Sequence, residues 1–311
     1  MELVNVGSFG ENLCEVQSYS ALPCGILIPM TSEDSGTPRI ITLTSDYGQD
    51  SLYTAALKAA IIQRDPSVRI VDITHGIRPF DTNQAAFALR ASIPHFPQGT
   101  VHLIAINTNP SDDYVHRVME LGGQYFIGLD DGIFSLIADR EPDAIHNINV
   151  SSESHIETFP ERHVFVQVAC HLAQGGVPAV IGPPAEGWVE SQWQRPLIGQ
   201  DYVQGTILHV DRFGNLITNI DQRTFKDVGR DRPFKIPLRS ARMDLTRIHS
   251  HYAGVPSGER LALFNHMGLL EIAIRHGADG HGGGASQLFG FRVGDTLRIE
   301  FEPAPPAGSL I

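Results

Sequence analysis

Hydrophobic and polar positions follow two different patterns along the chain. Between about residues 38 and 187, apolar runs rich in β-branched residues alternate with stretches whose apolar positions have helical spacing. This alternation is typical of a layered α/β domain with a largely parallel sheet. From about residue 200 onward, short apolar runs follow one another at fairly regular spacing. That second pattern is typical of a small β-barrel or sandwich.

The patterns predict individual elements. Strands of the first half are predicted at residues 39–45, 69–74 and 100–106, with paired strands at 117–121 and 124–128. Helices are predicted at residues 53–63, 83–93, 134–138 and 164–173. Strands of the second half are predicted at residues 205–210, 216–220, 234–237, 260–264, 269–274 and 296–301, with a flexible glycine-rich loop at 280–284.

An irregular segment at residues 188–200 separates the two patterns. We therefore predict an α/β protein in three parts: an N-terminal extension at residues 1–37, a layered α/β domain with a mainly parallel sheet at residues 38–190, and a small β-barrel domain at residues 200–311. The extension has weak periodicity and many Ser, Gly, Glu and Pro residues. At 311 residues the chain is long enough for two domains that each have a core.

Composition narrows the class of protein. Hydrophobic residues make up 42% of the chain and charged residues 19%, which is ordinary for a soluble protein. No run approaches the roughly 18 apolar residues of a membrane span, and no signal peptide is evident. The three widely spaced cysteines fit reduced thiols, so we expect a cytoplasmic protein. A net charge of −12 without a basic cluster argues against nucleic-acid binding.

The first predicted strand ends abruptly in Asp46-Tyr-Gly, and a predicted helix follows. In an open α/β sheet, ligands bind where the carboxyl ends of strands meet helix N-termini. Asp46 is therefore a candidate metal ligand, a candidate general base, or a candidate acceptor for a sugar cis-diol, because its two oxygens can accept from adjacent hydroxyls. A helix N-cap or turn aspartate explains the same residue without a ligand.

Other polar positions have simpler explanations. Asp72 and His75 end the second predicted strand, where hydrogen bonds between side chains and nearby backbone can shape the turn. Asp130-Asp131-Gly132 is a turn signal. The 14 histidines lack close ligand spacing, and the loose grouping of His249, His251, His276 and His281 does not predict a metal site.

The segment from Asp211 to Asn219 places an aromatic residue and an amide around a glycine between two predicted strands. The amide of Asn215 offers a donor and an acceptor together, which matches the edge of adenine. A hairpin turn explains the same residues, and both interpretations remain open at this point.

Seven short motifs in order along the chain resemble one family. They are ITLTSDYG from Ile41, IVDITH from Ile70, PQGTVH from Pro97, YFIGLDDG from Tyr125, TF at Thr158, DRFGNLITN from Asp211 and LEIA from Leu270. The family is the S-adenosyl-L-methionine (SAM) hydroxide adenosyltransferases, or SAM hydrolases, which are relatives of the fluorinase and chlorinase enzymes. The resemblance covers about residues 39–302.

The resemblance implies a reaction and an assembly. Members are homotrimers with an α/β N-terminal domain and a β-barrel C-terminal domain, and SAM lies between the N-terminal domain of one subunit and the C-terminal domain of its neighbour. Water or hydroxide attacks C5′ of the ribose, methionine leaves, and adenosine is formed. SAM is the substrate, and neither a cofactor nor a metal is implied. Because a sulfonium is already an excellent leaving group, the site must mainly position the reactants and strip the nucleophile of bulk water.

The resemblance also implies residue roles. Asp46 matches the carboxylate that binds the ribose diol, and Phe80 matches an aromatic wall of the site. Phe213 and Asn215 match the pair on the adenine side. The remaining substrate-binding positions implied by the motifs are Phe159, a second aromatic at Tyr252, Asp211 near the methionine amino group and His266 near the methionine end.

The chain departs from the family at three positions thought to handle the attacking water, where an Asp-Arg-His set is usual. Asn107 stands at the first position. The arginine position falls near Tyr114, unless a small insertion lets Arg117 serve. Pro160 stands at the histidine position.

These departures leave the handling of water open. An asparagine can orient water but cannot take its proton at neutral pH. Asn107 and His116 are our candidate catalytic residues, and Glu161 is a further substitute suggested by its place in the motif.

Three further hypotheses compete with SAM hydrolysis. A SAM- or adenosine-binding protein with little turnover would explain the three departures. A calcium-dependent nucleosidase is disfavoured because the segment around Asp46 and Asp50 has too few carboxylates for a cage of six to eight oxygens. A halide-using enzyme is disfavoured because residues 107–113 do not resemble the hydroxyl-rich halide pocket of that branch.

Overall fold

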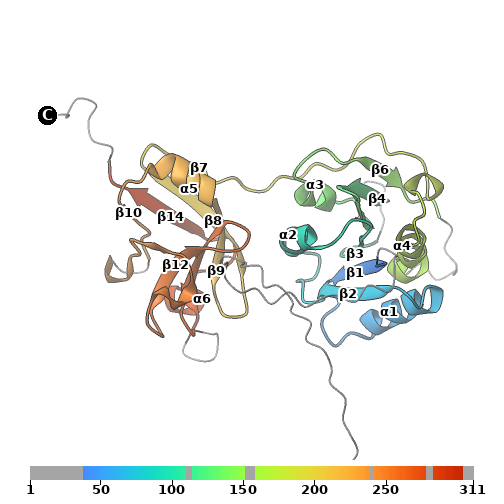
Figure 1. Cartoon of the computed structure of the whole chain (residues 1–311), viewed down its shortest axis with the longest axis horizontal. Helices are drawn as coiled ribbons and strands as arrows, with labels where there is room; N and C mark the ends of the chain where they lie inside the picture. The colour runs from blue at the N-terminus through green and yellow to red at the C-terminus, as the bar shows by residue number, and fades with distance from the viewer. Residues whose placement is uncertain (1–37, 110–113, 151–157, 239–240, 278–282, 304–311) are drawn as a thin grey trace, which may run out of the picture. The chain divides into compact units, whose positions relative to one another are not determined.

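The structure is a computed structural model, and it describes residues 38–109, 114–150, 158–238, 241–277 and 283–303. The predicted extension at residues 1–37 and most of the predicted loop at residues 280–284 lie outside these ranges. Among the described residues, no helix is both long and apolar enough to cross a membrane. Two sheets organise the chain (Figure 1).

The first sheet has six strands in the order β2-β1-β3-β5-β4-β6. Its parallel part consists of β2 (Arg69–Thr74), β1 (Ile40–Ser45), β3 (Val101–Ala105) and β5 (Gln124–Leu129). The strand β4 (His116–Leu121) pairs antiparallel with β5, and β6 (Ala144–Asn147) pairs antiparallel with β4, so β6 again runs in the direction of the parallel strands. The predicted mainly parallel sheet is therefore confirmed.

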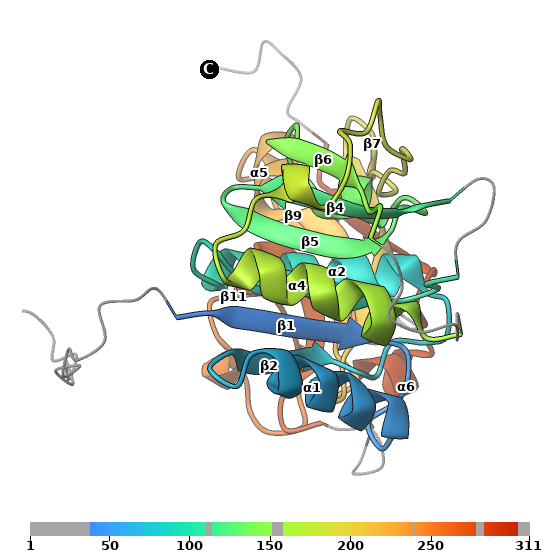
Figure 2. The same ribbon diagram turned by 90° about the vertical axis from the view of Figure 1, so that its right-hand side faces the viewer.

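Helices cover both faces of this sheet. The helices α1 (Leu52–Arg64) and α4 (Val166–Ala173) cover one face (Figure 2), and they pack there through apolar residues such as Leu57 and Val168. The helices α2 (Thr82–Ser92) and α3 (Ile133–Ile137) share a second core with residues of β3, β4 and β5, including Met119 and Phe126. The result is a three-layer α/β/α arrangement in which each helix buries one apolar face.

The second sheet follows the order β10-β14-β8-β9-β13-β12-β11, with β7 paired to β8. Its strands are β7 (Leu197–Ile198), β8 (Tyr202–Val210), β9 (Leu216–Asp221), β10 (Phe234–Lys235), β11 (Ile248–His249), β12 (Arg260–Phe264), β13 (Leu269–Ile274) and β14 (Thr296–Phe301). The first half of β8 pairs with β14 and its second half with β9, across a register shift near Ile207. Because such a shift bends a strand, the sheet curls into a half-barrel.

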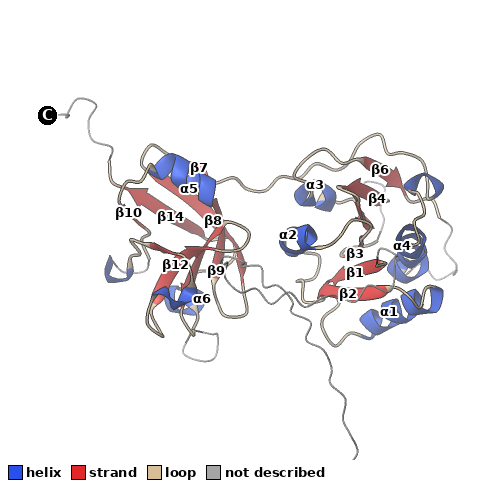
Figure 3. Cartoon of the chain, viewed as in Figure 1, coloured by secondary structure: helices blue, strands red, loops and turns tan. Residues whose placement is uncertain are grey.

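The structure adds helices to the second half that the sequence analysis missed (Figure 3). The helix α5 (Gln222–Gly229) is short and mostly polar, and the two apolar residues that it packs against the core, Phe225 and Val228, are too few to reveal a helical period in the sequence. It is held by its ends, since Asp221 Oδ1 accepts from the backbone N–H of Thr224 and Arg230 closes the helix in the left-handed conformation. The second missed helix is α6 (Ala285–Phe289).

Two further details refine the predictions. The predicted irregular segment at residues 188–200 contains β7, an edge strand of two residues. The predicted helix at residues 164–173 begins earlier than expected, because a π-helical turn at Glu161–Phe165 precedes α4. That turn places Glu161 next to the carboxyl ends of β1 and β3, where it accepts hydrogen bonds from Tyr47 and Thr108.

Candidate functional site

The carboxyl ends of β1 and β3 lie side by side, because Ser45 pairs with Ala105 in the parallel sheet. Asp46 directly follows β1, and Asn107 follows β3 by two residues. Asn107 has a positive φ of 47°, a left-handed conformation that Asn tolerates better than most residues. The structure therefore brings the candidate ribose ligand and the candidate water-handling residue to the same edge of the sheet.

Asp46 is half-buried and fixes the loop before α2. Its Oδ2 atom accepts a hydrogen bond of 2.9 Å from the backbone N–H of Phe80. Phe80 has a positive φ of 64°, and its ring is 70% exposed. A bulky residue in this conformation is strained unless its surroundings hold it there. A carboxylate oxygen has two lone pairs, so this bond leaves Asp46 able to accept from a ligand.

A buried carboxylate lies behind this edge. The Oε1 atom of Glu161 accepts hydrogen bonds from the hydroxyl of Tyr47, at 2.5 Å, and from the hydroxyl of Thr108. Glu161 is only 3% exposed. Burial, and then the nearby charge of Glu161, raises the pKa of the Tyr47 phenol, which stays protonated. The candidate residue Glu161 thus bridges the ends of β1 and β3.

His116, the other candidate catalytic residue, reaches the same cluster from β4. Its Nε2 atom lies 2.7 Å from the backbone carbonyl oxygen of Thr108, so that nitrogen carries the proton and donates it to the carbonyl. Burial lowers the pKa of His116 and favours the neutral imidazole. His116 therefore holds the backbone of Thr108 rather than presenting Nε2 as a base.

Phe159 lies in an aromatic cluster at the same edge. Its ring packs edge-on against Tyr53, with centroids 5.3 Å apart, and against Tyr47, with centroids 6.1 Å apart. The ring is half-buried. This packing explains why an aromatic residue stands at position 159. The contact of Phe159 with substrate stays a prediction.

Four predicted residues of the second sheet surround one cavity. Asp211, Phe213, Asn215 and Tyr252 line a space of about 450 Å³. Phe213 is 61% exposed, whereas Asn215 is buried. A mainly apolar cavity with a few polar groups is the usual form of a small-molecule site. The structure therefore gathers residues that the sequence motifs placed on the adenine and methionine sides.

Asp211 also shapes the turn between β8 and β9. Its Oδ1 atom accepts from the backbone N–H groups of Phe213, at 2.9 Å, and Asn215, at 2.8 Å. Its Oδ2 atom accepts from Nδ2 of Asn215 at 3.0 Å. The predicted hairpin turn is confirmed, and the bond to Asp211 fixes which way the amide of Asn215 faces. The second amide hydrogen and the carbonyl oxygen of Asn215 remain the groups with which it would read a base.

Glu271 is a site residue that the sequence analysis missed. The hydroxyl of Tyr252 donates to its Oε1 atom at 2.5 Å, and burial raises the pKa of the Glu271 carboxyl. Glu271 lines a larger cavity of about 780 Å³ together with Asp211, Tyr252 and the exposed His266. Its signal in the sequence was a single acidic residue within the apolar strand β13. It restrains the ring of Tyr252.

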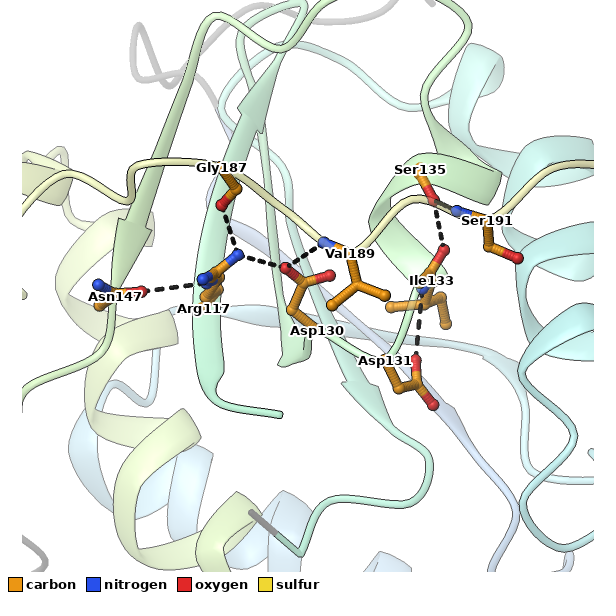
Figure 4. A network of polar contacts seen from close by, with 10 residues as sticks. Arg117, Asp130, Asp131, Ile133, Ser135, Asn147, Gly187, Val189 and Ser191 are labelled. Carbon is orange, nitrogen blue, oxygen red and sulfur yellow. Dashed lines mark hydrogen bonds and ion pairs between the residues drawn. The ribbon is translucent and has the colours of Figure 1, made fainter. Parts of the chain in front are cut away.

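Arg117 belongs to a structural network and not to the Asn107 cluster (Figure 4). Its Nη1 atom lies 2.5 Å from Oδ2 of Asp130 and 2.6 Å from the carbonyl oxygen of Gly187, and its Nε atom donates to Asn147 at 3.0 Å. Asp130 also accepts from the backbone N–H of Val189 at 3.1 Å. The alternative that Arg117 serves as the water-handling arginine is therefore not supported.

The other polar residues that the sequence singled out make local contacts, and the prediction is confirmed for Asp131 but not for Asp72 and His75. His75 Nδ1 lies 2.7 Å from Ser45 Oγ, and His75 Nε2 lies 3.2 Å from Asp72 Oδ1. Both contacts are between side chains, so the predicted bonds to backbone are wrong for Asp72 and His75, and Nε2 of His75 faces Asp72 at ion-pair distance without making a hydrogen bond. Asp131 Oδ1 accepts from the backbone N–H of Ile133 at 3.3 Å, in the turn predicted there. Within the described ranges, no three His, Cys, Asp or Glu residues form a group that could hold a metal ion.

Two family models match this chain, one over the residues of the first sheet and one over those of the second. The model of the SAM hydroxide adenosyltransferase N-terminal domain matches residues 41–182, and the model of the C-terminal domain matches residues 205–298. The (R)-S-adenosyl-L-methionine hydrolase of Thermus thermophilus is 29% identical over 276 residues, which cover 84% of this chain and 99% of that protein. The (R)-S-adenosyl-L-methionine hydrolase of Methanocaldococcus jannaschii is 31% identical over 195 residues, which cover 60% and 70%.

A solved structure is similar to this chain in both sequence and fold. The crystal structure of an uncharacterized conserved protein from Thermotoga maritima superimposes with a TM-score of 0.74 at 29% identity, covering 84% of this chain and 99% of that chain. The likeness extends through both halves of the described chain.

Proposed function

The chain belongs to the SAM hydroxide adenosyltransferase family, and from this premise we propose that it hydrolyses SAM to adenosine and L-methionine. Water attacks C5′ of the ribose, a C5′–O bond forms, the C5′–S bond breaks, and its electron pair goes to the sulfur of methionine. The attacking water releases one proton. The sulfonium leaves without protonation, so the reaction needs neither a general acid nor a cofactor.

One observation carries the proposal: Asp211, Phe213, Asn215 and Tyr252 surround a single cavity. Phe213 would stack on adenine, and Asn215 would bind its edge with the donor and acceptor that Asp211 leaves available. Tyr252 would form a second wall, while Asp211 and His266 would face the methionine end. The two (R)-S-adenosyl-L-methionine hydrolases described above support the proposed reaction.

The first sheet would supply the other half of the site. Asp46 would accept from the two ribose hydroxyls, with Phe80 and Phe159 as aromatic walls and Asn107 orienting the water. Phe80 and Phe213 are both large aromatic side chains with most of their surface exposed in a single chain. Exposed aromatic residues are typical of surfaces that bind a partner or ligand. We propose a cytoplasmic homotrimer in which a neighbouring subunit completes each site, and the exposure of these two rings supports a site that is completed by another subunit.

Chromatography of the products after incubation with SAM tests the proposal. We expect adenosine and methionine in equal amounts, at a rate well above the spontaneous background. Adenine as the product would indicate cleavage of the glycosidic bond instead, and no product at all would contradict hydrolysis.

A second function is favoured by a specific observation. Asn107, Tyr114 and Pro160 occupy the positions of the usual water-handling set, and the structure ties Arg117 to Asp130. A SAM- or adenosine-binding protein with little turnover would have this pattern. Calorimetric binding of SAM without release of adenosine would support it, and rapid turnover would exclude it.

A further inference from the structure

The proposed reaction leaves one proton to be accounted for. As C5′–O forms and C5′–S breaks, the attacking water becomes positively charged and must lose a proton. Asn107 has no basic group that could take it at neutral pH. The Nε2 atom of His116 already carries a proton that it donates to the carbonyl of Thr108. Two basic groups then remain in the cluster, Nδ1 of the neutral His116 ring and the carboxylate of Glu161, and among the described residues it is Glu161 that is hydrogen-bonded to the hydroxyls of Tyr47 and Thr108.

Glu161 is a buried carboxylate whose position needs an explanation. Within the ranges that the structure describes, its recorded polar partners are hydroxyl groups, and no lysine or arginine forms an ion pair with it. Burying a charge without a cation costs free energy, so fold stability alone does not favour glutamate here. A buried carboxylate that is held by two hydroxyl groups beside a candidate site is therefore a candidate functional group.

The two hydroxyls that bind Glu161 belong to chain neighbours of the site residues. Tyr47 follows Asp46, which would hold the ribose, and Thr108 follows Asn107, which would orient the water. The pairing of β1 with β3 brings the carboxyl ends of these two strands together. The π-helical turn places Glu161 within hydrogen-bonding distance of the residues that follow both strands. A hydroxyl that donates to a carboxylate keeps lone pairs with which it can accept from water.

Thr108 is better placed than Tyr47 to connect water with Glu161. His116 fixes the backbone of Thr108 through a 2.7 Å hydrogen bond, which orients its short side chain. The ring of Tyr47 packs instead against Tyr53, with centroids 5.7 Å apart, and against Phe159. Tyr47 therefore serves as a second donor that holds the Glu161 carboxylate in place.

We propose that Glu161 accepts the proton of the attacking water through the hydroxyl of Thr108. As the new C5′–O bond forms, the water proton moves to Thr108 Oγ1, and the hydroxyl proton of Thr108 moves to Oε1 of Glu161. Glu161 becomes a neutral carboxylic acid and returns the proton to solvent after adenosine leaves. This inference rests on the proposed SAM hydrolysis, and it makes Glu161 a positioning residue that acts through Thr108.

Matched variants test the relay. Glu161→Gln keeps an oxygen that accepts from both hydroxyls but cannot take a proton, so we expect kcat to fall by about 100-fold or more while KM for SAM changes less than about threefold. Thr108→Val removes the hydroxyl at nearly constant volume and should lower kcat similarly. Thr108→Ser restores the hydroxyl and should keep kcat within about fivefold of the unmodified protein. Glu190→Gln, at an exposed position, is the control.

The outcomes separate the relay from a structural role. If Glu161 only ties the strand ends together, Glu161→Gln retains kcat within about threefold, or Thr108→Val and Thr108→Ser behave alike, and the inference is wrong. If Glu161→Gln fails to fold, the pair of Thr108 variants decides alone. An unmodified protein that forms no adenosine contradicts the proposed function itself, whereas an active protein with an unaffected Glu161→Gln variant contradicts only the relay.

Discussion

Asp46 and Phe80 are joined by a hydrogen bond of 2.9 Å between the carboxylate Oδ2 and the backbone N–H. The bond connects the end of β1 to the loop before α2, and it holds Phe80 at a φ of 64°. The exposed ring of Phe80 is thereby fixed beside the carboxylate proposed to bind ribose. In the proposed site, one side chain would thus serve two purposes, as a ligand for ribose and as a support for the backbone of Phe80.

Asp46→Asn should weaken SAM binding with little loss of stability. An amide oxygen can still accept from the N–H of Phe80, but the charge and one acceptor oxygen are lost. Because hydrogen bonds to charged groups contribute about 1.5–3 kcal/mol, we expect the Kd to rise about 10- to 100-fold. Isothermal titration calorimetry with SAM measures this change. Asp50→Asn, an exposed neighbour in the same loop, is the control, and equal Kd values for the two variants would contradict the role of Asp46.

Phe213→Ala should weaken nucleoside binding and leave the melting temperature unchanged. The ring is 61% exposed, so its removal leaves no large cavity in the core. Stacking on a base contributes about 1–3 kcal/mol, which corresponds to roughly a 5- to 100-fold rise in the Kd for adenosine. Leu197→Ala, at a position that is 57% exposed, should leave the Kd unchanged. An unaltered Kd for Phe213→Ala would show that adenine binds elsewhere.

The α/β half could be predicted from the sequence because its elements are long and strongly patterned. β1 and β3 are rich in β-branched and apolar residues and are buried along almost their whole length, as expected for strands covered on both faces. The half-barrel was predicted less completely. The strands β7 and β11 were not predicted, and each has two residues, which is too short for any period to show.

The candidate site could be predicted only in part, because some of its contacts have no local pattern in the sequence. Asp46 could be singled out because its place at a strand end follows from topology. The contact of Glu161 with Tyr47 spans 114 residues, and a π-helical turn creates it. Neither feature has a local sequence signal. The pairing of Arg117 with Asp130 was hidden likewise, because turn signals explain Asp130 from its neighbours alone.

Arg117→Met should destabilise the fold strongly. Asp130 is 1% exposed, and removal of Arg117 leaves its carboxylate buried without a cation. Breaking a buried ion pair in this way costs about 3–5 kcal/mol. We expect a loss of that size in the free energy of unfolding measured with urea.

The double variant Arg117→Met/Asp130→Asn provides the control. Without a charge on residue 130, the cost of the missing arginine becomes smaller, so part of the stability should return. If the double variant is less stable than Arg117→Met by the full cost of a second independent substitution, the two side chains do not interact as described.

The fold should lose stability as the pH falls from about 6.5 to 4, and His102 should contribute to this loss. The ring is buried between Thr42 and Gln124, and its Nε2 atom donates to Oε1 of Gln124 at 2.9 Å. Burial lowers the pKa of His102 from 6.5 to about 4. Between these values the unfolded chain binds a proton at His102 that the native chain does not, so acid favours unfolding.

Unfolding curves of the unmodified protein and of His102→Gln, recorded from pH 7.5 to 4, measure that contribution. Carboxylates titrate in both proteins, so the difference between the two free energies of unfolding isolates His102. This difference should be constant above pH 6.5 and should shrink by up to about 3 kcal/mol as the pH approaches 4, since one pKa unit corresponds to about 1.4 kcal/mol. Parallel curves across this range would mean that His102 binds its proton equally well in the folded chain, and the burial argument would be wrong.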